Sequence, residues 1–210
     1  MSEQPAGPAL PGSYRWALVA AVIVGFQVAF SAGFDLNAAL NHDAPPSLTG
    51  SESAFPNLGL SPVAQQRIVL ATASAYQTVL EAMLPWRIAT SALLTLMAGL
   101  VFILGMRLRV TEEGRGTIAV QLGSAALAAA VMRSIDGAQS LVFTRTMALE
   151  ASKAFVREGL PDAEVVAAAG TFVVTAGSGA WTLVMVAGFV TLGNYFRSEA
   201  LRTALARVEP

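Results

Sequence analysis

The sequence predicts an all-α polytopic membrane protein in which four transmembrane helices form an antiparallel bundle. Of its 210 residues, 54% are hydrophobic and only 13% are charged, whereas about 25% of a typical soluble chain is charged. Four apolar stretches approach or exceed the length of about 20 residues that a helix needs to cross the hydrocarbon core. Helical spacing of apolar residues continues past three of them, which predicts that helices 2–4 extend beyond the outer membrane face.

Charge and residue inventory exclude several classes of function. A net charge of −1 provides no field that would attract nucleic acid. The chain has no cysteine and one histidine, His42, which leaves no thiolate or histidine-rich set for a metal or a haem. We interpret His42 and Asp43 as surface residues of a proline-rich loop rather than as a pH sensor or metal ligands. We therefore predict no cofactor, no metal site and no catalytic residue.

Charged residues bound the four predicted spans, which are residues 16–34, 86–106, 116–136 and 177–196. The fourth apolar stretch, Val165–Phe196, is longer than a span. At 1.5 Å per residue it is about 48 Å long, against a hydrocarbon core of about 30 Å. We count inward from Arg197 and place the outer end of this span near Gly177.

Basic residues predict the topology. Those that lie tight against one side of the spans, with few acids nearby, are Arg15, Arg107, Arg109, Arg115, Arg197, Arg202 and Arg207. Cytoplasmic loops carry an excess of such residues. We therefore predict a multi-pass protein of the cytoplasmic (inner) membrane with both termini in the cytoplasm. The first span also has the small residues Ala29 and Ser31 of a signal-peptide cleavage site, but its length favours an uncleaved helix.

Outside the membrane we predict three helical extensions, residues 61–84, 137–158 and 162–176, and a coil at residues 35–60, all within one domain of residues 1–210. Ser61-Pro62 is a capping hydroxyl followed by proline at the first helical position. Pro85 can kink a helix without ending it, so the first extension continues into the second span. Val165–Ala176 is apolar yet lies beyond the bilayer, and we expect the other two extensions to cover it.

Four ionisable residues form a predicted polar layer at the outer membrane face: Glu81, Arg87, Arg133 and Asp136. Arg133 and Asp136 are three apart and share a helix face. Ionisable groups near membrane depth are suspected of function. We nevertheless favour a structural interpretation, in which an arginine–aspartate pair holds two helices in register, because helical rise places these residues at the rim of the core.

Small residues predict where helices approach closely. Ser91, Thr95 and Gly99 recur at four-residue steps, and Gly177 and Gly179 lie in the fourth apolar stretch. In lipid, helices associate through such residues because no hydrophobic drive brings them together. The Gly177-Ser178-Gly179 run weakly resembles the serine motif of an intramembrane protease. That chemistry needs a base for the serine proton, and the only histidine is in the loop, so we interpret the run as a packing surface.

Three hypotheses of function remain. The first is a non-enzymatic helical bundle that acts as scaffold, sensor or subunit of an envelope complex. The second is a small oligomeric transporter or channel that uses the polar layer. The third is a lipid-modifying membrane enzyme with Glu81 or Asp136 as general base and Arg87 or Arg133 on an anionic head group. Expected partners are membrane lipids and further copies or other membrane subunits. Pairing of Asp136 in a dry contact would favour the first hypothesis over the second.

Overall fold

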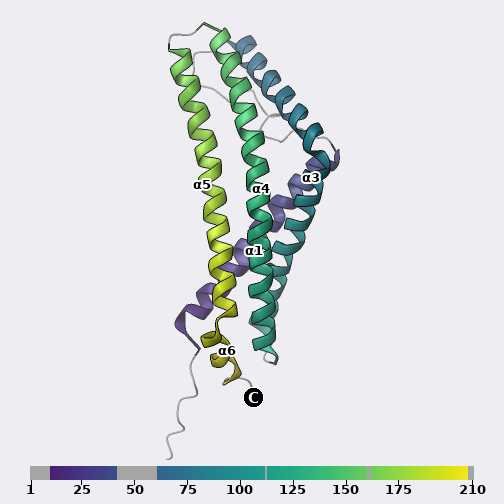
Figure 1. The fold of residues 1–210 in the computed structure, drawn as a ribbon, viewed down its shortest axis with the longest axis vertical. Helices are drawn as coiled ribbons and strands as arrows, with labels where there is room; N and C mark the ends of the chain where they lie inside the picture. Colours follow the sequence, from purple (N-terminus) through teal and green to yellow (C-terminus); the bar gives the residue numbers. More distant parts are fainter. Residues whose placement is uncertain (1–9, 42–60, 112, 160–161, 208–210) are drawn as a thin grey trace, which may run out of the picture. The chain divides into compact units, whose positions relative to one another are not determined.

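The computed structural model describes residues 10–41, 61–111, 113–159 and 162–207, and this part of the chain is helical. Its elements are α1 (Gly12–Asn41), α3 (Pro62–Val110), α4 (Arg115–Arg157), α5 (Ala163–Arg197) and α6 (Glu199–Ala206) (Figure 1). The first four are long and apolar enough to cross a membrane. The predicted fold class, an all-α bundle of four such helices with extensions, is confirmed.

Local chemistry explains where the helices begin and end. The Ser61 hydroxyl accepts a hydrogen bond from the Ala64 backbone N–H at 3.2 Å, which caps α3 at the predicted start. Pro85 lies inside α3 without ending it. Gly114, with φ of 69°, precedes α4, and Gly159, with φ of 68°, follows it. Glycine adopts this left-handed conformation without steric cost, so both turns are encoded locally.

The predicted coil at residues 35–60 is wrong at its start, because α1 continues to Asn41. Ala39 is buried in a small core with Leu80 of α3 and Phe143 of α4. This contact gives the last two turns of α1 an apolar side to bury, and so keeps them helical. The remainder of the predicted coil, including His42 and Asp43, lies outside the described residues.

The chain divides into two compact units, and the long helices contribute to both. Unit 1 contains the described residues of Met1–Gly33, Ala92–Ser134 and Val184–Pro210, and unit 2 contains those of Phe34–Ser91 and Ile135–Leu183. The boundaries of the membrane spans and the assignment of one domain stay predictions.

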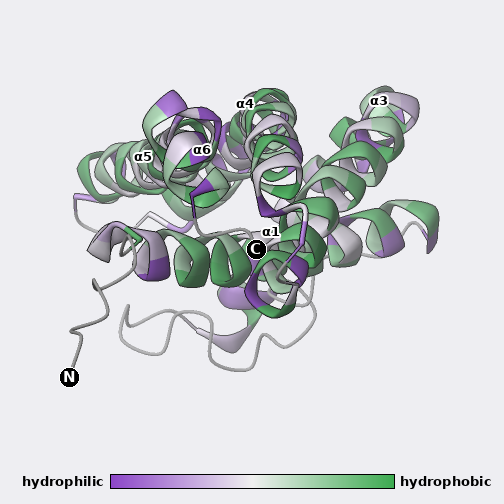
Figure 2. Ribbon diagram, turned by 90° about the horizontal axis from the view of Figure 1, so that it is seen from below, coloured by the Kyte–Doolittle hydropathy of each residue, from purple (hydrophilic) through white to green (hydrophobic). Residues whose placement is uncertain are grey.

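Unit 1 has a core of small and aliphatic residues, among them Ala21, Ala98 and Ala126, each without exposed surface. Hydrophobic residues dominate α1 over most of its length (Figure 2), and its large side chains, such as Trp16 and Phe26, are exposed. A helix that is apolar on all sides is typical of a membrane span. Unit 1 therefore has the surface of a lipid-embedded bundle.

Helices of unit 1 come closest at glycines that we did not predict. A Cβ on Gly25 would lie 2.8 Å from the Phe102 backbone nitrogen, and one on Gly123 would lie 2.8 Å from the Gly193 backbone oxygen. Backbone atoms cannot move aside as a flexible side chain can. These glycines therefore set the separation between α1 and α3 and between α4 and α5.

The residues that we predicted to pack differ in their surroundings. Ser91 is fully buried, and Thr95 reaches within 4.0 Å of the Cβ position of Gly33. No described atom lies within 4 Å of a Cβ on Gly99 or Gly177, and Gly179 makes only an ordinary 3.7 Å contact with Leu141. Each four-residue step turns about 40° further around a helix, so the row that starts at Ser91 has rotated away from its neighbour by Gly99.

The expectation that Val165–Ala176 is covered is also wrong. This part of α5 is helical, as predicted, but Val165 is 69% and Val173 65% exposed. Ala163 and Ala167 are buried, and the Thr171 hydroxyl lies 3.4 Å from the Ala148 carbonyl oxygen of α4. One side of α5 is therefore packed, and the valines on the opposite side have no cover within the described residues.

The close approach at Gly25 leads to a first prediction. We expect Gly25→Ala to lower the free energy of unfolding by about 1–3 kcal/mol, because the added methyl group collides with backbone of α3. The matched control is Gly99→Ala, which has open space and replaces glycine by a better helix former. Thermal unfolding in a mild detergent measures both. Equal effects of the two substitutions would show that the α1–α3 contact is not as close as described.

Candidate functional site

One arginine links three helices within unit 2. Arg87 of α3 donates from Nη1 to Asp136 Oδ1 of α4 at 2.6 Å and from Nη2 to Asp35 Oδ2 of α1 at 2.8 Å. Asp136 is only 1% exposed, and Arg87 is also buried. We name Asp35, Arg87 and Asp136 the ion cluster. Hydrogen bonds between charged side chains, such as these, are stronger than hydrogen bonds between neutral groups.

The local sequence brings each member of the ion cluster into place. Arg87 follows Pro85 by two residues, directly before the apolar run of α3. Asp136 precedes Gly137, and a Cβ on Gly137 would collide with the side chain of Thr182 on α5. Because residue 137 is glycine, α5 lies close against α4 there, and Thr182 is itself buried.

Aromatic side chains form one wall of the ion cluster. The Cζ atom of Arg87 lies 5.7 Å from the centre of the Phe143 ring, a distance at which a cation is attracted to the ring face. Tyr76 packs against the same ring with 5.4 Å between centres. Burial raises the pKa of the Tyr76 phenol, and the nearby Arg87 charge acts in the opposite direction. The phenol is therefore neutral at physiological pH and adds no charge to the cluster.

Neutral polar groups complete the surroundings. Arg87 Nη1 also points to Ser140 Oγ at 3.4 Å. One helical turn further along α3, Thr90 Oγ1 accepts a hydrogen bond from Gln139 Nε2 of α4 at 3.0 Å. The α3–α4 contact thus carries two successive polar connections, which fix the register of the two helices.

In the predicted polar layer, the structure places Arg87 and Asp136 in direct contact. Glu81 is exposed, because six residues of helix place it about 120° away from Arg87 around α3. Arg133 belongs to unit 1 and is half-buried. Whether any of the four has a functional role stays a prediction.

Sequence reasoning missed Asp35 and Phe143 as members of the site. Asp35 was assigned to a coil, although it is the first charged residue after the apolar run of α1. Arg87 and Asp136 also lie at the ends of apolar runs. Charged residues at the same end of three neighbouring spans were the signal that could have identified the cluster. The sequence gives no such indication for Phe143, because an apolar residue on the apolar face of a helix is predicted to belong to the hydrophobic core.

The ion cluster joins three helices through its two ion pairs. The guanidinium is engaged by two carboxylates, and Asp136 is only 1% exposed. Among the described residues, no group of three or more His, Cys, Asp or Glu side chains is placed to hold a metal ion. The two ion pairs of Arg87 connect α3 to α1 and to α4.

Comparison of the chain with protein-family models, curated proteins and solved structures found no match. The fold and the site define an integral membrane helical bundle with an internal ion cluster. A four-helix architecture by itself implies no particular function, so the role has to be argued from the surfaces and sites of this chain.

The ion cluster leads to a second prediction. We expect Asp136→Ala to lower the free energy of unfolding by about 1.5–3 kcal/mol, because Arg87 would lose the buried one of its two carboxylate partners. The double variant Arg87→Met with Asp136→Leu should recover most of that loss, since no buried charge remains and Asp35, with 48% of its side chain exposed, can be hydrated. The control is Glu81→Gln, at an exposed position on α3.

Thermal unfolding of the wild type, the single variant, the double variant and the control in the same detergent measures these differences in stability. A double variant as unstable as the single variant would mean that the cluster contributes more than paired charge. A single variant as stable as the control would mean that Arg87 and Asp136 are not a buried pair.

Proposed function

We propose that the protein is a non-enzymatic membrane scaffold, a subunit of an envelope complex that associates through the uncovered side of α5. The proposal is based on a set of exposed apolar side chains on α5, which we name the outward face. Its residues are Val165, Val166, Ala169, Val173 and Ala176. An apolar patch of this kind on a protein surface is typical of an interaction site.

Helical geometry explains why the outward face is one continuous surface. At about 100° per residue, these five positions fall on the side of α5 opposite to Ala163, Ala167 and Thr171, which pack toward α4. The predicted span of α5 starts at Gly177. The outward face therefore lies in the part of α5 that we expect beyond the hydrocarbon, where water rather than lipid would contact it.

The ion cluster supports the same proposal. An interaction surface is effective when its supporting helices are held in one arrangement, because association then orders fewer groups. Arg87 provides this constraint for α1, α3 and α4, and the contact of Thr182 with Gly137 connects α5 to α4. A rigid helical frame of this kind favours a scaffold.

The alternatives receive less support from the same geometry. A relay or gate group of a transporter has to reach water, whereas Asp136 is buried against Arg87. A lipid-modifying enzyme would need a base beside a cation that is available for an anionic head group. Glu81 points away from Arg87, and both Asp35 and Asp136 already occupy that guanidinium.

We propose a second copy of the chain or another membrane subunit as the partner, in the inner membrane, with both termini in the cytoplasm. Outward faces on two copies would be self-complementary, because valine and alanine can meet valine and alanine about a two-fold axis. A different subunit with an apolar helix would fit equally well.

The outward face leads to a third prediction. We expect Val173→Glu to disperse the assembly to monomers, because association would then bury an unpaired carboxylate. Val63→Glu is the matched control, since Val63 is 58% exposed on α3 and is not part of the outward face. Particle mass in a mild detergent and cross-linking in native membranes measure association. A wild-type chain that is monomeric in both experiments would refute the proposal.

A further inference from the structure

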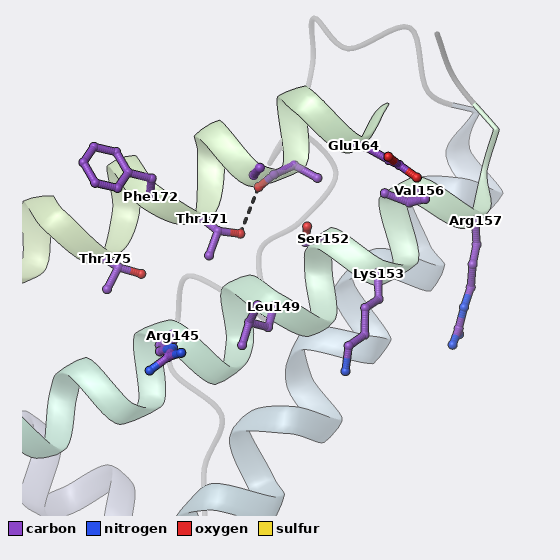
Figure 3. A pocket seen from close by; sticks show the side chains of 12 residues that line it. Arg145, Leu149, Ser152, Lys153, Val156, Arg157, Glu164, Thr171, Phe172 and Thr175 are labelled. Atoms are coloured by element: carbon purple, nitrogen blue, oxygen red, sulfur yellow. Dashed lines mark hydrogen bonds between the residues drawn. The ribbon is translucent and has the colours of Figure 1, made fainter. Parts of the chain in front are cut away.

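A groove of about 800 Å³ runs between α4 and α5 in unit 2, separate from the ion cluster. Figure 3 shows its two walls, with Leu149, Lys153 and Val156 on α4 and Thr171, Phe172 and Thr175 on α5. The volume lies in the range of about 300–1,000 Å³ that is typical of sites for small molecules.

The two ends of the groove differ in charge. Arg157 and Glu164 line one end, where charges of opposite sign are both present, and Arg145 and Thr175 lie on opposite walls at the other end (Figure 3). No acidic side chain lines the groove near Arg145. The Arg145 end therefore has a net positive charge and favours an anion.

Two polar groups at this end lack partners in the described chain. Thr175 Oγ1 is buried and has no hydrogen-bond partner, and Arg145 takes part in no described ion pair. By contrast, the Thr171 hydroxyl donates to the Ala167 carbonyl oxygen at 2.9 Å, and Lys153 pairs with Glu150 on its own helix. A buried hydroxyl without a partner costs free energy. Arg145 on the facing wall is exposed, so an anionic oxygen in the groove can pair with its guanidinium.

The remainder of the groove is apolar. Leu149 and Val156 line the α4 side, and Ala167, Ala168 and Phe172 line the α5 side. Leu149 and Val156 are seven residues apart, about two helical turns, so an extended hydrocarbon chain could follow them from the Arg145 end. Apolar walls with a few polar groups at one end are the usual design of a site for an amphipathic ligand.

We propose that this groove binds an anionic amphiphile, with its carboxylate or phosphate between Arg145 and Thr175 and its hydrocarbon chain along Leu149, Val156 and Ala168. Arg145 pairs with the head group, and the Thr175 hydroxyl donates to one of its oxygens. The single unbalanced cation and the small volume favour one such molecule over an acidic peptide. This site is distinct from the proposed partner surface, which uses Val173 on another side of α5.

The test is a titration of the full-length protein, in nanodiscs of neutral lipid, with a dansyl-labelled fatty acid and with the corresponding fatty alcohol. We expect the acid to bind about tenfold more tightly than the alcohol, and Arg145→Gln to remove that preference. Thr175→Val should weaken acid binding in the same direction. Ala168→Trp should abolish binding of both probes, because the indole fills an exposed part of the groove.

The matched control is Arg202→Gln, which removes an exposed arginine of α6 in unit 1 and should leave both affinities unchanged. Thermal unfolding confirms that each variant is folded. The proposal is overturned if Arg145→Gln leaves the preference for the acid intact, or if Ala168→Trp leaves binding intact.

A photoreactive amino acid at position 168, used in native membranes, distinguishes the sources of the ligand. An adduct with the mass of a phospholipid identifies a membrane lipid, and one with the mass of a free fatty acid identifies a released chain; both support the proposal. A protein adduct would overturn it in favour of a peptide occupant. Arg145→Gln should not change the mass of the assembly, so failure of this site and failure of the partner surface are separate outcomes.

Discussion

The arrangement of helices in unit 2 depends on the need of one buried guanidinium for partners. Removal of Arg87 from water is costly unless opposite charges and hydrogen bonds replace the lost hydration. Its two partners lie on two other helices, so α1, α3 and α4 can satisfy the arginine in only one mutual register. The buried apolar cluster that joins these helices consists of Ala39, Leu80 and Phe143, with six partly buried hydrophobic residues packed against them. Apolar packing is non-directional, so the ionic contact adds the constraint on the register of the three helices.

Unit 1 achieves specificity by a different physical means. Its helices meet at Gly25, Gly123 and Gly193, where backbones lie too close for any side chain. In lipid, apolar side chains gain nothing from one another that the acyl chains do not also offer. Close backbone contact remains as the way to select one partner face. Unit 2 thus selects its helix arrangement through ion pairs. Unit 1, which we expect in lipid, selects its arrangement through close contact between backbones.

Sequence analysis predicted the features that a single helix encodes, and it predicted only part of those that depend on pairs of helices. The start of α3 at Ser61 and its passage through Pro85 follow from local chemistry and are confirmed. Arg87 was identified because it interrupts an apolar pattern. Asp35 was not identified as a member of the ion cluster, because this required knowledge that α1 stays helical after Phe34. Close contact at Gly25 rather than Gly99 depends on the register of α1 against α3, which neither segment encodes alone.

The exposed valines of α5 follow from the different apolar patterns of the helices. Between Glu164 and Arg197 the sequence of α5 has no charged residue, so all its sides are apolar. By contrast, α4 beyond Asp136 alternates apolar residues with Arg145, Lys153 and Arg157, and has only one apolar side to offer. A helix with one apolar side can cover about one side of its neighbour. The prediction that the extensions cover α5 considered only the total apolar content of the helices. The extent of burial depends instead on how many apolar helix faces can pack against each other. An apolar face without a matching one in the described chain is the physical basis of the partner that we propose.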